Sequence, residues 1–243
     1  MDIPQLILTT MAALVALTIH EFAHGYVAYR LGDDTAKSMG RLSLNPIKHL
    51  DPFGVICMVL FHFGWAKPVP INPRNFKNPR RGFAISAMAG PATNLIVGFF
   101  TAFLYLLCLS TFRQVEHTFI NNLEINLLTF LQYFFIINVG LGIFNLIPVP
   151  PFDGSRILNI ILPKRWYFKV MRYERQIYWG VIAWLFLGDY VYMGLMSVPF
   201  IAASTVLSAI AQIFNLSGLI GMAIDAIYNG ILSLWQLIPF FKV

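Results

Sequence analysis

The sequence contains four apolar segments long enough to cross a lipid bilayer, at residues 3–29, 82–112, 127–147 and 177–199. A helix needs about 20 mostly apolar residues to span the hydrocarbon, where each backbone polar group must be satisfied internally. The chain of 243 residues is 58% hydrophobic and 12% charged, whereas soluble domains carry about 25% charged residues. We therefore predict an all-α polytopic membrane protein.

Two further apolar regions are less regular. Residues 200–240 are interrupted by polar residues and glycines, so they are expected to form helices that span, re-enter or lie at the interface. Residues 50–65 are too short for a span and are flanked by proline and glycine, which favours a short re-entrant or β-hairpin element. The sequence thus predicts about 4–6 transmembrane helices, with a core at 1–199 and apolar C-terminal helices at 200–243.

The basic residues predict the orientation of the chain. Fifteen of the 17 Lys and Arg residues lie in two stretches, 30–81 and 156–175, which two spans separate. Both stretches therefore share one side of the membrane, and the positive-inside rule makes that side cytoplasmic. The N-terminus is then outside. The net charge of +6 reflects this sorting rather than nucleic-acid binding.

The first apolar segment contains His20-Glu21-Phe22-Ala23-His24, an H-E-x-x-H motif. Two histidines at i and i+4 lie on one face of a helix and can bind one metal ion, and the glutamate can act as general base for an attacking water. His24 precedes Arg30 by about 9 Å of helix rise, which places the site inside the membrane near its cytoplasmic side.

A catalytic zinc site usually has three protein ligands, and Asp153 is the candidate for the third. It follows Pro148, Pro150 and Pro151, which end the third span on the same side as His24. A carboxylate near lipid is costly unless it is paired or bound to metal. The alternative is that Asp153 caps a helix, and both roles are compatible.

Two amides lie near the expected depth of the metal. Asn94 follows Gly90-Pro91 in the second span, and Asn145 ends the third. Either side chain could hydrogen-bond a substrate carbonyl or the oxyanion that develops from it. Asn94 could instead repair the break in the helix near Pro91.

Three separated motifs resemble those of the site-2 protease family of intramembrane zinc metalloproteases. They are His20-Glu21-x-x-His24, Gly90-Pro91-x-x-Asn94 and Asn145-x-x-Pro148-x-Pro150-x-x-Asp153-Gly154, and the resemblance covers roughly residues 8–160. It implies one Zn²⁺ per chain with His20, His24 and Asp153 as ligands, Glu21 as catalytic base, and Asn94 and Asn145 near the substrate. The loop between the second and third spans is too short for the PDZ domain that many members carry.

The resemblance implies an intramembrane zinc endopeptidase. Its substrates are expected to be transmembrane segments of other proteins, cleaved near the cytoplasmic side in regulated intramembrane proteolysis or in the clearance of membrane remnants. The alternative from another class is a membrane protein that binds or transports metal at the same residues. Glu21→Gln separates the two, because only a protease needs a general base there. The sequence names neither the substrate nor the oligomeric state.

Overall fold

The computed structural model describes residues 3–61, 66–112, 118–212 and 215–238. All regular elements in these ranges are helical, and a single antiparallel bridge joins Leu50 to Ala66. The elements are α1 (Ile3–Arg30), α2 (Thr35–Ser38), η1 (Pro46–His49), α3 (Pro52–Phe61), η2 (Pro73–Asn75), α4 (Pro79–Thr111), α5 (Thr118–Leu146), α6 (Gly154–Ile161), α7 (Lys164–Arg172), α8 (Glu174–Met196), α9 (Pro199–Ala203), α10 (Thr205–Ala211) and α11 (Leu216–Gln236). The predicted all-α class is confirmed.

The helices α1, α4, α5 and α11 are each long and apolar enough to cross a membrane. The fourth predicted segment forms α8, whose two halves meet at an angle of 48°. Counting α8 as one broken span gives five spans in the described part of the chain, within the predicted range of about four to six. The protein is therefore a multi-pass membrane protein.

The region after α1 differs in part from its prediction. Residues 52–61 form the helix α3, and in the described residues the expected hairpin is reduced to the bridge between Leu50 and Ala66. Pro52 fits the first turn of a helix, where no N–H is needed, and Asp51 accepts the free N–H groups of Phe53 and Gly54. Residues 62–65 lie outside the described part, and re-entry of this element into the bilayer stays a prediction.

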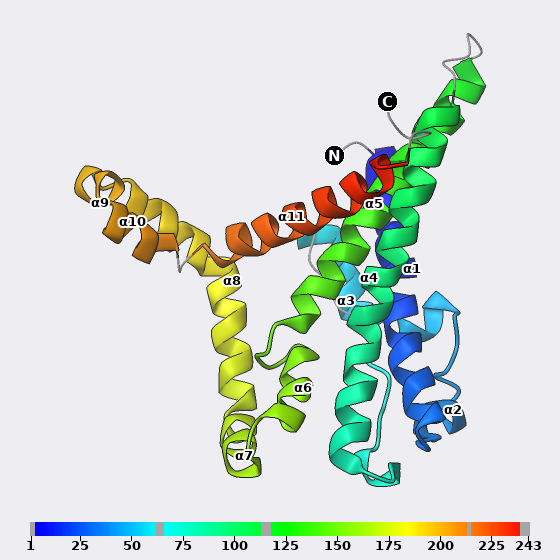
Figure 1. The fold of residues 1–243 in the computed structure, drawn as a ribbon, viewed down its shortest axis with the longest axis vertical. Coiled ribbons are helices and arrows are strands. Elements are labelled where there is room, and N and C mark those ends of the chain that lie inside the picture. The colour runs from blue at the N-terminus through cyan, green and yellow to red at the C-terminus, as the bar shows by residue number, and fades with distance from the viewer. Residues whose placement is uncertain (1–2, 62–65, 113–117, 213–214, 239–243) are drawn as a thin grey trace.

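A three-helix bundle of α1, α4 and α5 forms the centre of the molecule (Figure 1). Small residues line the contacts, which lets the backbones approach closely. In α1 the buried positions include Ala12, Ala16, Ala23 and Ala28, and in α4 they include Gly82, Ala84, Gly90, Gly98 and Ala102. The start of α4 is set by Asn78, whose side chain accepts the N–H of Arg81 just before the helix.

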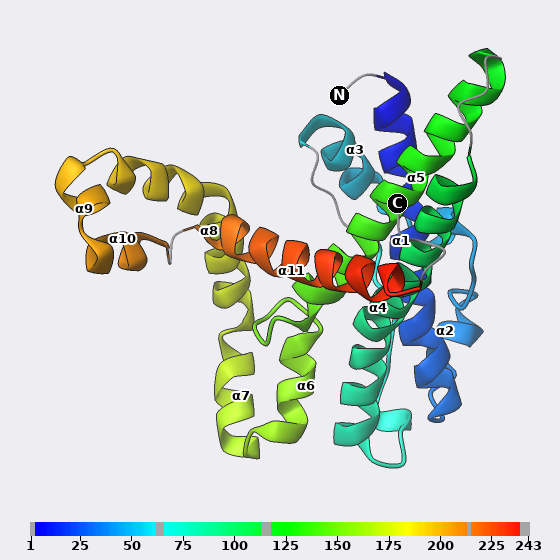
Figure 2. The same cartoon turned by 45° about the horizontal axis from the view of Figure 1, so that its top comes forward.

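The C-terminal helices lead away from this bundle and then return to it. Figures 1 and 2 show α9 at the far end of α8 and α10 beside the second half of α8, while α11 runs back across α5 and α4. On α11, Tyr228 stacks on buried Phe135, and Trp235 donates its indole N–H to the carbonyl oxygen of Phe99 at 2.9 Å. The contact of α11 with the bundle is therefore mainly apolar and aromatic.

Candidate active site

The two histidines of the H-E-x-x-H motif lie on the buried face of α1. The Nε2 atoms of His20 and His24 are 3.0 Å apart, and both side chains are almost completely buried. Gly90 of α4 lies against them, and a Cβ atom there would be 2.5 Å from Nε2 of His24. The absence of a side chain at Gly90 therefore makes the space that the two imidazoles occupy.

Asp153 reaches the same point from the segment between α5 and α6. Its Oδ2 atom lies 3.1 Å from Nε2 of His20 and 3.1 Å from Nε2 of His24. The close approach of α6 to the end of α5 depends on Gly154, because a Cβ atom there would lie 2.3 Å from the carbonyl oxygen of Leu146. The polypeptide can thus turn back sharply enough to place the carboxylate beside the histidines.

The other ring nitrogen of His20 is held by an amide network. Its Nδ1 atom is 2.5 Å from Oδ1 of Asn94, and Nδ2 of Asn94 donates to Oδ1 of Asn138 at 2.7 Å and to the carbonyl oxygen of Ala16 at 3.3 Å. Since Asn94 uses its NH₂ on these two acceptors, its oxygen faces the ring, and the proton of His20 is assigned to Nδ1. The three helices α1, α4 and α5 meet in this network.

His24 is fixed in the same way by the backbone of α4. Its Nδ1 atom lies 2.7 Å from the carbonyl oxygen of Ser86, which can only accept, so Nδ1 carries the proton. Metal-ligating histidines characteristically donate their second ring N–H to a carbonyl or a comparable acceptor, which fixes the tautomer and the ring orientation. In its neutral form each histidine therefore presents the lone pair of Nε2 to Asp153.

The donor set fits a zinc ion. The ligand atoms of His20, His24 and Asp153 all lie within 4.8 Å of one another. When both imidazoles are neutral, their Nε2 lone pairs and the carboxylate oxygen face each other and repel unless a cation lies among them. Tetrahedral zinc at about 2.0–2.1 Å from its ligands sets neighbouring ligand atoms about 3.3 Å apart, close to the separations found here. Two nitrogens and one oxygen also match the ligands of known catalytic zinc sites.

Glu21 lies between the two histidines in sequence and contacts the segment 66–72. Its Oε2 atom accepts the backbone N–H of Val69 at 2.7 Å. Val69 crosses α1 at Gly25, where a Cβ atom would be 3.0 Å from Cγ1 of the valine. The segment 66–72 therefore covers this face of α1 and fixes one oxygen of the Glu21 carboxylate.

Hydrogen bonds hold the segment 66–72 at both ends. Arg41 donates from Nη2 to the carbonyl oxygens of Lys67 and Pro68, at 2.8 and 3.3 Å. Asp33 accepts the N–H of Asn72 through Oδ2 at 2.7 Å. The contact between Val69 and Glu21 lies between these two anchors.

Asp33 is fully buried just after α1 and has several donors around it. Oδ1 accepts from the backbone N–H and the hydroxyl of Thr35 and from Nδ2 of Asn75, in addition to the contact of Oδ2 with Asn72. Burial alone would raise the pKa of this carboxyl, but the hydrogen bonds from Thr35, Asn72 and Asn75 outweigh it and lower the pKa below its ordinary value. Asp33 is therefore held as a carboxylate that joins the end of α1 to the segment 66–72.

The two amides named from the sequence lie in different surroundings. Asn94 is fully buried and makes the contacts to His20 and Asn138 described above. Asn145 is half-buried near the end of α5, and its NH₂ donates to the carbonyl oxygen of Leu141 at 3.0 Å. Contact of either amide with a substrate stays a prediction.

Charged groups hold α6, the helix that follows Asp153, against its neighbours. Arg80 of α4 donates to the carbonyl oxygen of Leu162 at the end of α6. Arg156 of α6 pairs with Glu174 at the start of α8, and its guanidinium lies 5.6 Å from the ring centre of Phe83. The position of Asp153 is thus tied to both α4 and α8.

This geometry can be compared with known proteins. Residues 8–188 match the model of Peptidase family M50. The chain belongs to this family. The M50 match begins in α1, includes the three converging side chains and ends within α8, so it leaves α9, α10 and α11 outside.

Curated relatives of this M50 peptidase carry names that agree with the family assignment. They include "Putative zinc metalloprotease YwhC" of Bacillus subtilis, 45% identical over 66% of this chain and 70% of the relative. "Putative zinc metalloprotease Rip2" of Mycolicibacterium smegmatis and "Zinc metalloprotease MJ0392" of Methanocaldococcus jannaschii are each 30% identical over 63% of this chain, and the matches span 56% and 33% of those proteins. No solved structure matches. The predictions of the site-2 protease family, a metalloprotease and zinc are confirmed.

The sequence reasoning missed three supports of this M50 site: Asn138, the carbonyl of Ser86 and the amide of Val69. Asn138 carries a usable signal, because an amide in the middle of an apolar span needs a partner. Ser86 and Val69 act through their backbones, which no side-chain pattern reveals.

Proposed function

We propose that this chain is an intramembrane zinc endopeptidase that hydrolyses peptide bonds in or near transmembrane segments of other proteins. The observation that carries the proposal is the convergence of His20, His24 and Asp153 within the helix bundle, with Glu21 next to His20 in α1. Of these, His20 and His24 come from the interior of an apolar helix and are nearly buried. Ionisable groups at such positions are costly and usually mark a functional site.

In this proposal His20, His24 and Asp153 bind the zinc. Bound there, zinc polarises a carbonyl and lowers the pKa of water towards neutrality. Glu21 takes the proton of the attacking water and passes it to the leaving amine. The Val69 N–H holds Oε2 of Glu21, so that Oε1 remains for the proton transfer. Asn94 acts as a positioning residue for His20, and Asn145 is the remaining candidate for contact with the substrate carbonyl.

We place the site towards the cytoplasmic side, with the N-terminus outside. The C-terminus of α1, the N-terminus of α4 and the basic helix α7 lie at the same, lower end of the molecule in Figure 1. The positive-inside rule assigns such an end to the cytoplasm. The peptidase core is taken as 1–199 and the region 200–243 as appended apolar helices.

A substrate helix must unwind before its backbone can react, because its carbonyls are otherwise hydrogen-bonded and shielded. The segment 66–72 is not helical and runs beside Glu21, which supports binding of the unwound peptide alongside it by strand addition. The products would be a released fragment in regulated intramembrane proteolysis, or the remains of a degraded membrane protein. Substitutions along 66–72 that leave cleavage unchanged would contradict this binding mode.

The test compares wild-type protein with Glu21→Gln in detergent micelles, using a panel of model transmembrane substrates and a zinc measurement on each protein. Glu21→Gln removes the base but keeps the shape, so cleavage should fall by about 10²–10⁴ while zinc stays bound. Glu124→Gln on α5 is the matched control and should behave as wild type. Zinc in both proteins with no cleavage by wild type on any substrate would favour a metal-binding or transport role.

A further inference from the structure

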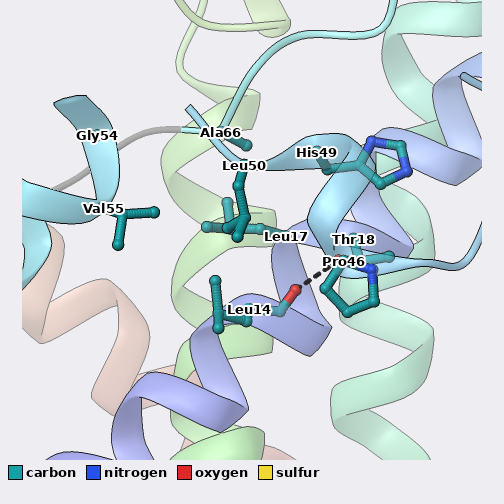
Figure 3. A pocket seen from close by; sticks show the side chains of 9 residues that line it. All are labelled: Leu14, Leu17, Thr18, Pro46, His49, Leu50, Gly54, Val55 and Ala66. Atoms are coloured by element: carbon teal, nitrogen blue, oxygen red, sulfur yellow. Dashed lines mark hydrogen bonds between the residues drawn. The ribbon is translucent and has the colours of Figure 1, made fainter. Parts of the chain in front are cut away.

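A small apolar pocket lies between α1 and the chain that follows it (Figure 3). Its walls include Leu14, Leu17 and Thr18 from α1 on one side, and Leu50, Val55 and Ala66 on the other. Its empty volume is about 300 Å³, including the part open to solvent, and the enclosed part has room for about one water-sized group.

The polar side chains of the wall are only partly engaged elsewhere. The Thr18 hydroxyl donates to the carbonyl oxygen of Leu14 at 2.7 Å, the dashed contact in Figure 3, and so it turns to its own helix. His49 places its Nε2 atom 2.6 Å from the carbonyl oxygen of Ser43, while its buried Nδ1 atom has no hydrogen-bond partner among the described residues. The pocket therefore offers mainly carbon surface to an occupant.

The pocket is aligned with the proposed active site along α1. Leu14, Leu17, Thr18 and Glu21 stand at i, i+3, i+4 and i+7, which is one face of a helix. Leu17 precedes Glu21 by about 6 Å of helix rise and Leu14 by about 10 Å. The pocket thus begins about one turn from the proposed base, on the side towards the N-terminus of α1.

The opposite wall of the pocket is also connected to the Glu21 carboxylate. Ala66 lines the pocket, and three residues later the N–H of Val69 bonds to Glu21. Three residues of chain span at most about 10 Å, and the two turns of α1 on the other side cover the same distance. A peptide lying extended between these walls and reacting beside Glu21 would therefore reach the pocket two or three residues from the cleaved bond.

We propose that this pocket is a specificity subsite of the peptidase, which accepts one small apolar side chain, such as alanine, two or three residues from the scissile bond. The inference rests on the proposed endopeptidase function and adds a substrate preference to it. The enclosed room sets the size, since a methyl group fills it and a larger side chain must displace Leu14, Leu17 or Val55. The preference is for a small residue on the side of the bond that faces the N-terminus of α1.

The experiment uses purified full-length protein and a model transmembrane substrate that the wild type cleaves, with the cleaved bond identified by mass spectrometry. Alanine, leucine and phenylalanine are placed in turn at the second and third positions on each side of that bond. One position should show a fall in kcat/KM of about tenfold or more from alanine to phenylalanine. Leu14→Ala and Leu17→Ala enlarge the pocket and should restore cleavage of the leucine and phenylalanine substrates.

Val15→Ala is the matched control, because Val15 is exposed on another face of α1. It should leave the size preference unchanged, and cleavage of the alanine substrate by Leu14→Ala shows that this variant is folded. Cleavage by wild type without a size preference at these four positions overturns the subsite alone. A size preference that neither enlarged variant relaxes also overturns it. If wild type cleaves no substrate, the proposed function fails together with the subsite.

Discussion

The bundle of α1, α4 and α5 and the C-terminal helices α8–α11 are packed by different kinds of contact. In the most apolar stretch of each bundle helix 28% of the residues are buried, against 0% in α11. The bundle buries polar side chains that bond across helices, among them Asn94 and Asn138, whereas α11 meets it through Tyr228, Trp235 and aliphatic residues. Lipid tails are as apolar as a leucine surface, so apolar contacts alone select a partner weakly. The buried amides and imidazoles are therefore what make the bundle specific.

The largest difference in zinc binding and cleavage between the two regions is expected when a methyl group is added to a glycine in each of them. Gly90→Ala should abolish zinc binding and cleavage, because the new Cβ would lie 2.5–2.7 Å from atoms of both imidazoles. The rings have no room to yield, since Asn94 and the Ser86 carbonyl hold their Nδ1 atoms. Zinc content and substrate cleavage of the purified variant are the measurements.

Gly221→Ala on α11 is the control for this change. A Cβ at Gly221 has no neighbour within 4 Å among the described residues, so zinc and cleavage should stay at wild-type levels. Retention of zinc by Gly90→Ala would show that the two histidines are less constrained than their hydrogen bonds indicate.

The second largest effect is expected when the hydrogen bonds of Asn94 with His20 and Asn138 are removed. Asn94→Leu leaves the Nδ1–H of His20 and the oxygen of Asn138 without this partner. Loss of such a supporting contact typically weakens metal affinity by about 10–100-fold. Zinc titration against a chelator measures the change, with Asn229→Leu on the exposed side of α11 as a control that should keep wild-type affinity. Equal affinities in the two variants would remove Asn94 from the positioning role.

The comparison also separates what the sequence could predict from what it could not. His20 and His24 follow from an i, i+4 spacing, and Asp153 follows from a proline-rich end of a span on the same side of the membrane. These are local patterns. Asn94 as partner of His20, and Val69 as partner of Glu21, depend on contacts between segments 74 and 48 residues apart, so no local pattern contains them.

The helices, too, divide into those that the sequence predicts and those that depend on contacts with the rest of the fold. Length and hydropathy predicted α1, α4 and α5, because an apolar run of this length in a bilayer has to be helical. The short α3 and the bend in α8 were not predicted, since residues 50–65 are compatible with both helix and hairpin and the bend has no proline at its centre. A short apolar segment takes its form from its neighbours.

A moderate effect is expected where α1 is joined to the segment 66–72. Asp33→Asn replaces a buried carboxylate that several donors share, and it should lower the free energy of unfolding by about 2 kcal/mol. Because the folded-state pKa of Asp33 is lowered, its contribution is present above the ordinary aspartate pKa of about 3.9 and is lost as the pH falls through the folded-state value. Thermal unfolding in detergent should therefore show a smaller loss of stability on acidification in Asp33→Asn than in wild type.

Asp34→Asn is the control for that measurement, because Asp34 is exposed and makes no side-chain hydrogen bond to the start of α2. Its unfolding midpoint should follow that of wild type at each pH. An acid dependence as steep in Asp33→Asn as in wild type would assign the dependence to other groups.

The smallest effect is expected at the contact between α11 and the bundle. Trp235→Phe removes the hydrogen bond to the Phe99 carbonyl but can keep ring contacts with Phe99 and Phe103, whose ring centres lie 4.7 and 4.8 Å from that of Trp235. One neutral hydrogen bond contributes about 0.5–1.5 kcal/mol, so the unfolding midpoint should fall slightly while zinc affinity and cleavage remain. A loss of zinc as large as that in Asn94→Leu would show that α11 supports the metal centre, and the two regions would then have to be treated as one cooperative unit.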